Sequence, residues 1–207
     1  MNTQTTVHPK LHHYGLTTAN LDLMIDWYGK VLGMTTNYRL AVPAGAQHGP
    51  GFSAMAFASN DEVHHRIAFF EMPACVADPD KRRHRGMQHV AFEYESLDDL
   101  LGTYARLKSA GILPVMAIDE GLQTGFYYTD PDQNIVELNV CNYDNESTAT
   151  QHMRSASSAA DRPRRIHVDP EKMFAARIAG ASPRELHERA FAGEFAPARP
   201  PHAPALV

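Results

Sequence analysis

The chain has 207 residues, of which 43% are hydrophobic and 21% charged, and its formal net charge is -5. This length allows one full core and is short for two independent domains. The acidic balance excludes a basic field for nucleic acid, and no apolar stretch reaches the roughly 18 residues of a membrane helix. The two cysteines lack partners at zinc-finger spacing. With no apolar signal segment at its start, the protein is expected to be cytoplasmic.

Two similar segments, each led by a histidine, follow one another along the chain. They align when residues 12–33 are placed over residues 88–111, which puts His13 over His89. In each copy a short strand leads to a polar cap, a Leu-Asp pair and an amphipathic helix that ends near a glycine. Strand-like stretches follow each helix, at 53–59 and 64–72 in the first copy and at 112–118, 124–130 and 134–140 in the second.

This order, βαβββ twice, predicts an α+β fold. The two modules, about 11–72 and 87–142, are expected to share one core within a domain of residues 1–145. From about residue 145 the composition shifts to Ser, Thr, Ala and Arg, so residues 146–207 are interpreted as a C-terminal tail. Two short helices are predicted there, at 168–180 and 182–193, before a Pro-rich end. The tail is expected to serve packing or a homo-oligomer rather than catalysis.

Three residues form a candidate metal site. His13 and His89 occupy equivalent positions of the repeat, and Glu137 lies in the middle of the apolar run IVELNV. An unpaired carboxylate in a buried strand is costly, and metal coordination is one of few ways to keep it. Two imidazoles and one carboxylate leave other metal positions open, as in Fe(II) oxygenases. Each residue alone has an ordinary alternative, a hydrogen-bonded core histidine or an exposed strand glutamate, so the interpretation depends on their joint placement.

With these residues the chain resembles the vicinal oxygen chelate superfamily, whose paired βαβββ modules wrap around a metal, over about residues 11–142. It is similar in particular to the type I extradiol dioxygenases. The resemblance implies an incomplete barrel around Fe(II), with Mn(II) as an alternative metal, held by His13, His89 and Glu137. It also implies O2 as co-substrate and a small aromatic diol as substrate, whose catechol ring is opened in the catabolism of aromatic compounds.

The resemblance implies two catalytic side chains as well. His65 corresponds to the acid/base histidine of the family. Tyr127 corresponds to its active-site tyrosine, which can hydrogen-bond a bound substrate oxygen; otherwise Tyr127 is an ordinary half-buried strand tyrosine. Strand alternation predicts that His64 points away from His65 and that His12 lies on the face opposite His13. The remaining internal histidines are given no role: His48, His84, His152, His167, His187 and His202.

One departure concerns the loop before the Tyr127 strand. Many members of the family place another histidine there, whereas this chain has Asp119, Glu120 and Gln123. Which of these replaces the loop histidine, if any does, is left open by the sequence.

Two other functions fit the same fold. One is a glyoxalase-like or epimerase-like isomerase, which uses Ni, Zn, Co or Mn and ordinarily needs a fourth protein ligand. The other is a non-catalytic small-molecule binding module, which normally lacks the metal triad. Overlaying HRIAFFE on QNIVELN places Phe69 over Glu137, so the fourth-ligand position is expected to be apolar. Glu71 is the nearby carboxylate, and it is expected to lie beyond reach of the metal.

Overall fold

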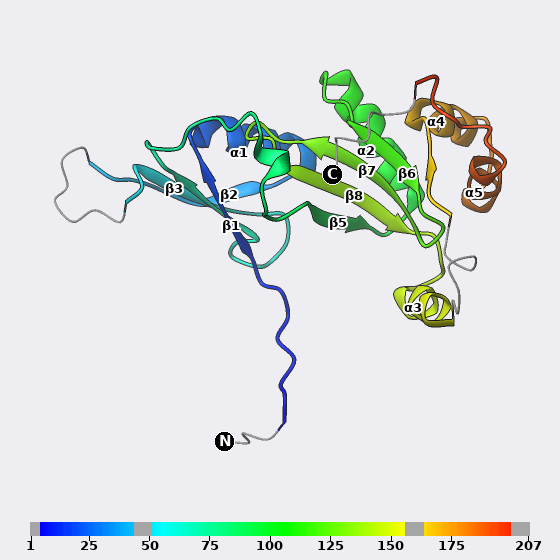
Figure 1. The fold of residues 1–207 in the computed structure, drawn as a ribbon, viewed down its shortest axis with the longest axis horizontal. Helices are drawn as coiled ribbons and strands as arrows, with labels where there is room; N and C mark the ends of the chain where they lie inside the picture. The colour runs from blue at the N-terminus through cyan, green and yellow to red at the C-terminus, as the bar shows by residue number, and fades with distance from the viewer. Residues whose placement is uncertain (1–4, 44–50, 156–163, 200–207) are drawn as a thin grey trace. The chain divides into compact units, whose positions relative to one another are not determined.

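The computed structural model describes residues 5–43, 51–155 and 164–199. The chain divides into two compact units, Met1–Ala77 and Asp78–Val207, and each is described by itself. Figure 1 follows their elements in chain order. Among the described residues no helix is both long and apolar enough to cross a membrane.

The first unit is one βαβββ module. Its elements are β1 (Tyr14–Thr18), α1 (Leu21–Leu32), β2 (Thr35–Ala41), β3 (Ala54–Ser59) and β4 (Ile67–Glu71). The strands form an open sheet in the order β1-β4-β3-β2, in which β1 and β4 are parallel and the other pairs antiparallel. Because β1 and β4 run the same way, the segments that precede them meet at one end of the sheet.

Helix α1 begins and ends where the sequence predicts. The Asn20 side chain accepts a hydrogen bond from the backbone N–H of Leu23, and Gly33 closes the helix with φ at 67°. The first turn has a second cap, the carboxylate of Glu71, because the backbone N–H of Leu21 donates to Glu71 Oε2 at 3.0 Å. Glu71 Oε1 accepts from the Ser53 hydroxyl at 2.8 Å. Both oxygens of Glu71 are therefore engaged within the first module.

The second unit repeats the module and extends it. It contains a short 3-10 turn (Lys81–Arg83), then β5 (Val90–Tyr94), α2 (Leu97–Ser109), β6 (Met116–Asp119), β7 (Gln123–Thr129) and β8 (Ile135–Cys141). Its open sheet has the order β5-β8-β7-β6-β9, again with a parallel pair, β5 with β8, at one edge. The two-module α+β fold predicted from the sequence is thus confirmed.

The tail contributes to the second unit. Its elements are α3 (Glu146–Ser155), β9 (Ile166–His167), α4 (Pro170–Ile178) and α5 (Pro183–Phe191). Strand β9 pairs with β6. Helix α4 is tied to α2, because Arg177 Nε donates to Asp98 Oδ1 at 2.6 Å and the Tyr104 hydroxyl donates to Glu171 at 2.9 Å. Helices α4 and α5 coincide with the two expected helices, whereas α3 was not expected. The end of the Pro-rich segment, from residue 200, lies outside the described residues.

Strand register corrects the overlay of the two modules. In the first sheet Gly15 on β1 lies opposite Ala68 on β4, and in the second Ala91 on β5 lies opposite Glu137 on β8. Gly15 and Ala91 are equivalent in the repeat, since each lies two residues after its leading histidine. The counterpart of Glu137 is therefore Ala68.

Phe69 lies on the other face of β4, toward the helix. Its fully buried ring packs on Tyr28 of α1, with centroids 5.2 Å apart. In the second module the counterpart of Phe69 is Leu138, and the ring of the equivalent Tyr104 lies 6.1 Å from that of Phe126 on the neighbouring strand β7. The prediction that Phe69 occupies the position of Glu137 is wrong by one residue, and such a slip turns every side chain to the opposite face. Ala68, like Phe69, cannot coordinate a metal.

Candidate metal and catalytic residues

Glu137 is a buried carboxylate at the centre of the second sheet. It lies on β8, is 1% exposed and pairs directly with Tyr127 on the neighbouring strand β7. The strand flanking it on the other side, β5, follows directly after His89, so the parallel pairing of β5 with β8 brings that histidine to the same place. The residues that the sequence assigned to the second module, His89, Tyr127 and Glu137, therefore meet on one face.

Four side chains contact the Glu137 carboxylate. His89 Nε2 lies 3.0 Å from Oε2, and Gln123 Nε2 donates to Oε1 at 2.9 Å. The Tyr127 hydroxyl and the Asn139 side chain also hydrogen-bond to Glu137. Gln123 in turn is steadied by Asn139, whose amide donates to its oxygen at 3.4 Å. From the sequence, Gln123 was one of three residues considered for the place of the loop histidine, and the choice was left open.

Gly125 makes room for this arrangement. It lies between Gln123 and Tyr127 on β7, so a side chain there would point to the same face as theirs. A Cβ added to Gly125 would come within 2.5 Å of Glu137 Oε1. The glycine therefore leaves the space into which the carboxylate extends.

Burial has the largest influence on the pKa of this group. It raises the pKa of Glu137 above its usual range, while the hydrogen bond from Tyr127 and the imidazole of His89 act in the opposite direction. The pKa of Tyr127 is also raised, first by burial and then by the neighbouring carboxylate of Glu137. Tyr127 is consequently a phenol near neutral pH and can donate a hydrogen bond.

These donors suit a divalent metal ion. A carboxylate removed from water needs a compensating charge, and in the described part of the chain its nearest basic partner is the imidazole of His89. The other ring nitrogen of His89, Nδ1, is hydrogen-bonded to Gln88 Oε1, which leaves Nε2 turned toward Glu137. A metal-bound histidine usually donates its other ring N–H to an oxygen acceptor, and the contact of Nδ1 with Gln88 would leave Nε2 for a metal shared with Glu137.

The histidines of the first unit form a second group. His13 precedes β1, His65 precedes β4, and their ring centroids are 4.3 Å apart. His12 and His64 join them: the Nδ1 atoms of His12 and His13 are 2.8 Å apart, and His64 is hydrogen-bonded to His65. The predictions that His12 lies opposite His13 and that His64 points away from His65 are therefore wrong. The strands begin only at Tyr14 and Ile67, so strand alternation does not apply to these residues.

His65 is the buried member of this group, at 8% exposure. Its ring stacks on Phe57 of β3, with centroids 4.4 Å apart and planes inclined by 17°. Phe57 lies opposite Ala68 just as Tyr127 lies opposite Glu137, so it is the counterpart of Tyr127. Burial, followed by the neighbouring histidines, lowers the pKa of His65. The imidazole is therefore neutral near pH 7 and able to accept a proton.

The three polar residues at the turn from β6 to β7, Asp119 at the end of β6, Glu120 between the strands and Gln123 at the start of β7, have three different contacts. Gln123 contacts the Glu137 carboxylate, whereas Glu120 forms an ion pair with Arg165 at 2.7 Å. Asp119 is fully buried and binds His187 of α5, with Oδ2 and Nδ1 2.7 Å apart. Of the three loop residues, Gln123 is thus the one at the candidate site. The contact of His187 could not be predicted from the sequence, because its partner is 68 residues away.

Two βαβββ modules with histidines before their first strands define the class of the fold. A family model described as the Glyoxalase/Bleomycin resistance protein/Dioxygenase superfamily matches residues 10–138, and the chain belongs to this family. A solved glyoxylase/bleomycin resistance protein/dioxygenase domain from Frankia sp. EAN1pec has the same fold, with a TM-score of 0.56 and 21% identity over 67% of this chain and 96% of that one.

Two curated relatives from Rhodococcus globerulus resemble the chain along most of its length. Biphenyl-2,3-diol 1,2-dioxygenase 2 is 34% identical over 195 residues, which cover 94% of this chain and 95% of the relative. Biphenyl-2,3-diol 1,2-dioxygenase 3 is 34% identical over 189 residues, covering 90% and 92%. The family resemblance inferred from the sequence is confirmed, and the similarity includes the tail.

Proposed function

We propose that the protein is an Fe(II)-dependent extradiol dioxygenase, which opens the aromatic ring of a catechol-type diol with O2. The observation that carries this proposal is the buried Glu137 carboxylate beside His89 and Tyr127. It occurs in a chain 34% identical to two biphenyl-2,3-diol 1,2-dioxygenases over at least 90% of its length.

The proposed iron ligands are His89 and Glu137 from the second unit and His13 from the first. The first two converge in the structure, and His13 is assigned by its equivalence to His89 in the repeat. Mn(II) is the alternative metal for the same donors. When bound, such a metal supplies open positions at which both diol oxygens and O2 can be brought together.

Side chains of the protein would carry out proton transfer and orient the substrate. His65, kept neutral by its burial and its histidine neighbours, accepts a proton from the diol and later returns it. Tyr127 remains protonated and offers its hydroxyl to a substrate oxygen, so that it orients the ring. In the overall reaction a ring C–C bond next to the diol breaks and both atoms of O2 enter the ring-opened product, which requires no external reductant.

The isomerase alternative is disfavoured by the first module. Such an enzyme ordinarily needs a fourth protein ligand, and the counterpart of Glu137 is Ala68, which offers none. The nearby Glu71 caps α1 and binds Ser53. A non-catalytic binding module would not need a buried carboxylate paired with a histidine.

The proposal is tested by reconstituting the protein with Fe(II) under anaerobic conditions and then adding air with a panel of catechols that includes biphenyl-2,3-diol. We expect at least one diol to give a yellow ring-fission product, which is measured by its visible absorbance. A protein that is loaded with iron but yields no such product from any diol would contradict the proposal.

A further inference from the structure

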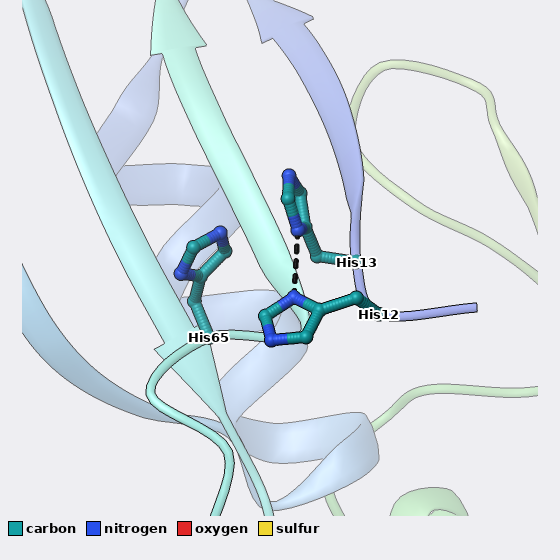
Figure 2. Close-up of side chains that lie close together, drawn as sticks. All are labelled: His12, His13 and His65. Carbon is teal, nitrogen blue, oxygen red and sulfur yellow. Dashed lines mark hydrogen bonds between the residues drawn. The ribbon is translucent and has the colours of Figure 1, made fainter. Parts of the chain in front are cut away.

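The histidine group of the first unit has the composition of a metal site of its own. His12, His13 and His65 each offer a ring nitrogen, and these atoms all lie within 4.8 Å of one another. Figure 2 shows the three rings turned toward a common space, His12 and His13 from the segment before β1 and His65 from the segment before β4. Nothing in the proposed iron site requires His12.

Local contacts hold this group together. The parallel pairing of Tyr14 with Ile67 brings the two segments to the same end of the sheet. Arg66 spans them, since its Nη1 donates to the carbonyl of His12 at 3.1 Å while its Nε and Nη2 bind Asp61 at 2.8 and 2.7 Å. The three imidazoles are therefore positioned by the backbone and by a salt bridge.

The donor set differs in chemistry from that of the second unit. The group consists of imidazoles alone, without a carboxylate. Imidazoles suit Zn²⁺ and Cu²⁺, and three of them plus one water complete the tetrahedral shell of Zn²⁺. Zn–N bonds of ~2.0–2.1 Å place tetrahedral ligand atoms about 3.4 Å apart, and the three ring nitrogens already lie within 4.8 Å of one another. His64, hydrogen-bonded to His65, supplies the outer partner that metal-bound histidines usually have.

We propose that His12, His13 and His65 form a Zn²⁺-capturing site within the first unit, whose occupation inhibits the enzyme. The inhibition rests on the proposed function, because His13 is the assigned iron ligand and His65 the assigned acid/base residue. Zinc bound at this site withdraws both residues from the reaction. His12 belongs only to the zinc site.

The site is tested by zinc titration of the full chain with the His89→Gln/Glu137→Ala substitutions, which remove the second unit's two candidate ligands. Isothermal titration calorimetry of the apoprotein should detect one Zn²⁺ per chain. Adding His12→Gln should weaken this binding by at least about tenfold, since even the loss of an outer partner typically costs ~10–100-fold. His8→Gln, an exposed histidine of the same segment, is the matched control and should leave the affinity unchanged.

Two results would overturn the proposal: no zinc binding by the doubly substituted chain, or equal affinity with and without His12→Gln. These readouts do not depend on ring cleavage, so they remain informative if the dioxygenase proposal fails. In the iron-loaded enzyme, zinc should abolish turnover of the wild type at concentrations that leave His12→Gln active. Equal zinc sensitivity of the two proteins would contradict the inhibitory role.

Discussion

The two units share one topology and differ in the polar groups that their sheets present. The first carries four clustered histidines, whereas the second carries one histidine beside a buried carboxylate and a tyrosine. The difference is concentrated at equivalent positions, with Ala68 and Phe57 in one sheet where the other has Glu137 and Tyr127. The two modules therefore share a backbone arrangement, and differences at a few positions place clustered imidazoles in one module and a buried carboxylate in the other.

The largest effect is expected from placing a carboxylate on either face of β4. Phe69→Glu buries a charge against Tyr28 and should prevent stable folding, since even loss of a buried Phe ring typically costs ~3–5 kcal/mol. Ala68→Glu should be tolerated better, because it restores the symmetry with Glu137, and should bind a divalent metal but lose ring cleavage. Thermal denaturation and metal analysis distinguish the two variants, with Phe69→Leu as control. A fully stable Phe69→Glu would show that the faces are assigned wrongly.

The next effect concerns proton transfer in the first unit. His65→Ala should retain iron and bind catechol but lose turnover by ~10²–10⁴-fold, the usual contribution of a general acid/base group. Steady-state kinetics with iron-loaded protein measures this loss. His64→Ala should be milder, because His64 acts only through its hydrogen bond to His65. Wild-type activity in His65→Ala would exclude the acid/base role.

A smaller effect is expected where β7 makes room for the carboxylate. Gly125→Ala places a Cβ within 2.5 Å of Glu137 Oε1, so the carboxylate must shift and lose its contact with Gln123. Iron affinity should fall by ~10–100-fold, as for other disturbed ligand supports. Gly102→Ala is the control: it lies in α2, where an added Cβ meets nothing within 4 Å, and should leave iron affinity unchanged. Equal affinities of the two variants would contradict the role of Gly125.

The sequence predicted those features that depend on local pattern. Caps such as Asn20 and glycines such as Gly33 fixed the helices, and the alignment of His13 with His89 fixed the repeat. Strand β2 was not located from the sequence; its residues are mostly exposed, including the apolar Tyr38 and Leu40, so burial gives it little pattern. Helix α3 was missed since it buries a single residue, Ala149, and has no apolar face to detect.

Register and long-range contacts could not be derived in the same way. By sequence similarity, the runs IAFF and IVEL align one residue away from their true structural equivalence. The pairings of β1 with β4 and of β5 with β8 are needed to show that Ala68 is the counterpart of Glu137. The role of Gln123 depends on the absence of a side chain at Gly125. The contact between Asp119 and His187 depends on where the tail packs, which no local pattern encodes.

The smallest predicted effect is a pH dependence of stability in the second unit. The hydrogen bond to Asp119 raises the pKa of His187 above its usual value, so the protonated imidazole stabilises the fold. This contribution is complete below the unfolded-state pKa of ~6.5 and is lost as the pH rises through the higher folded-state pKa. The difference in Tm between wild type and His187→Gln should therefore shrink as pH increases from about 6. A difference that grows with pH would contradict the assignment.

The proposed iron binding depends above all on His89 and Glu137, and iron content tests this dependence most directly. Protein purified with protection from oxidation should hold about one Fe(II) per chain, because the residues that the structure describes contain one such ligand set. His89→Ala and Glu137→Ala should each reduce this to background in elemental analysis, whereas substitution of the exposed carboxylate Glu62 by Gln should not. Normal iron content in both His89→Ala and Glu137→Ala would show that the metal is held elsewhere.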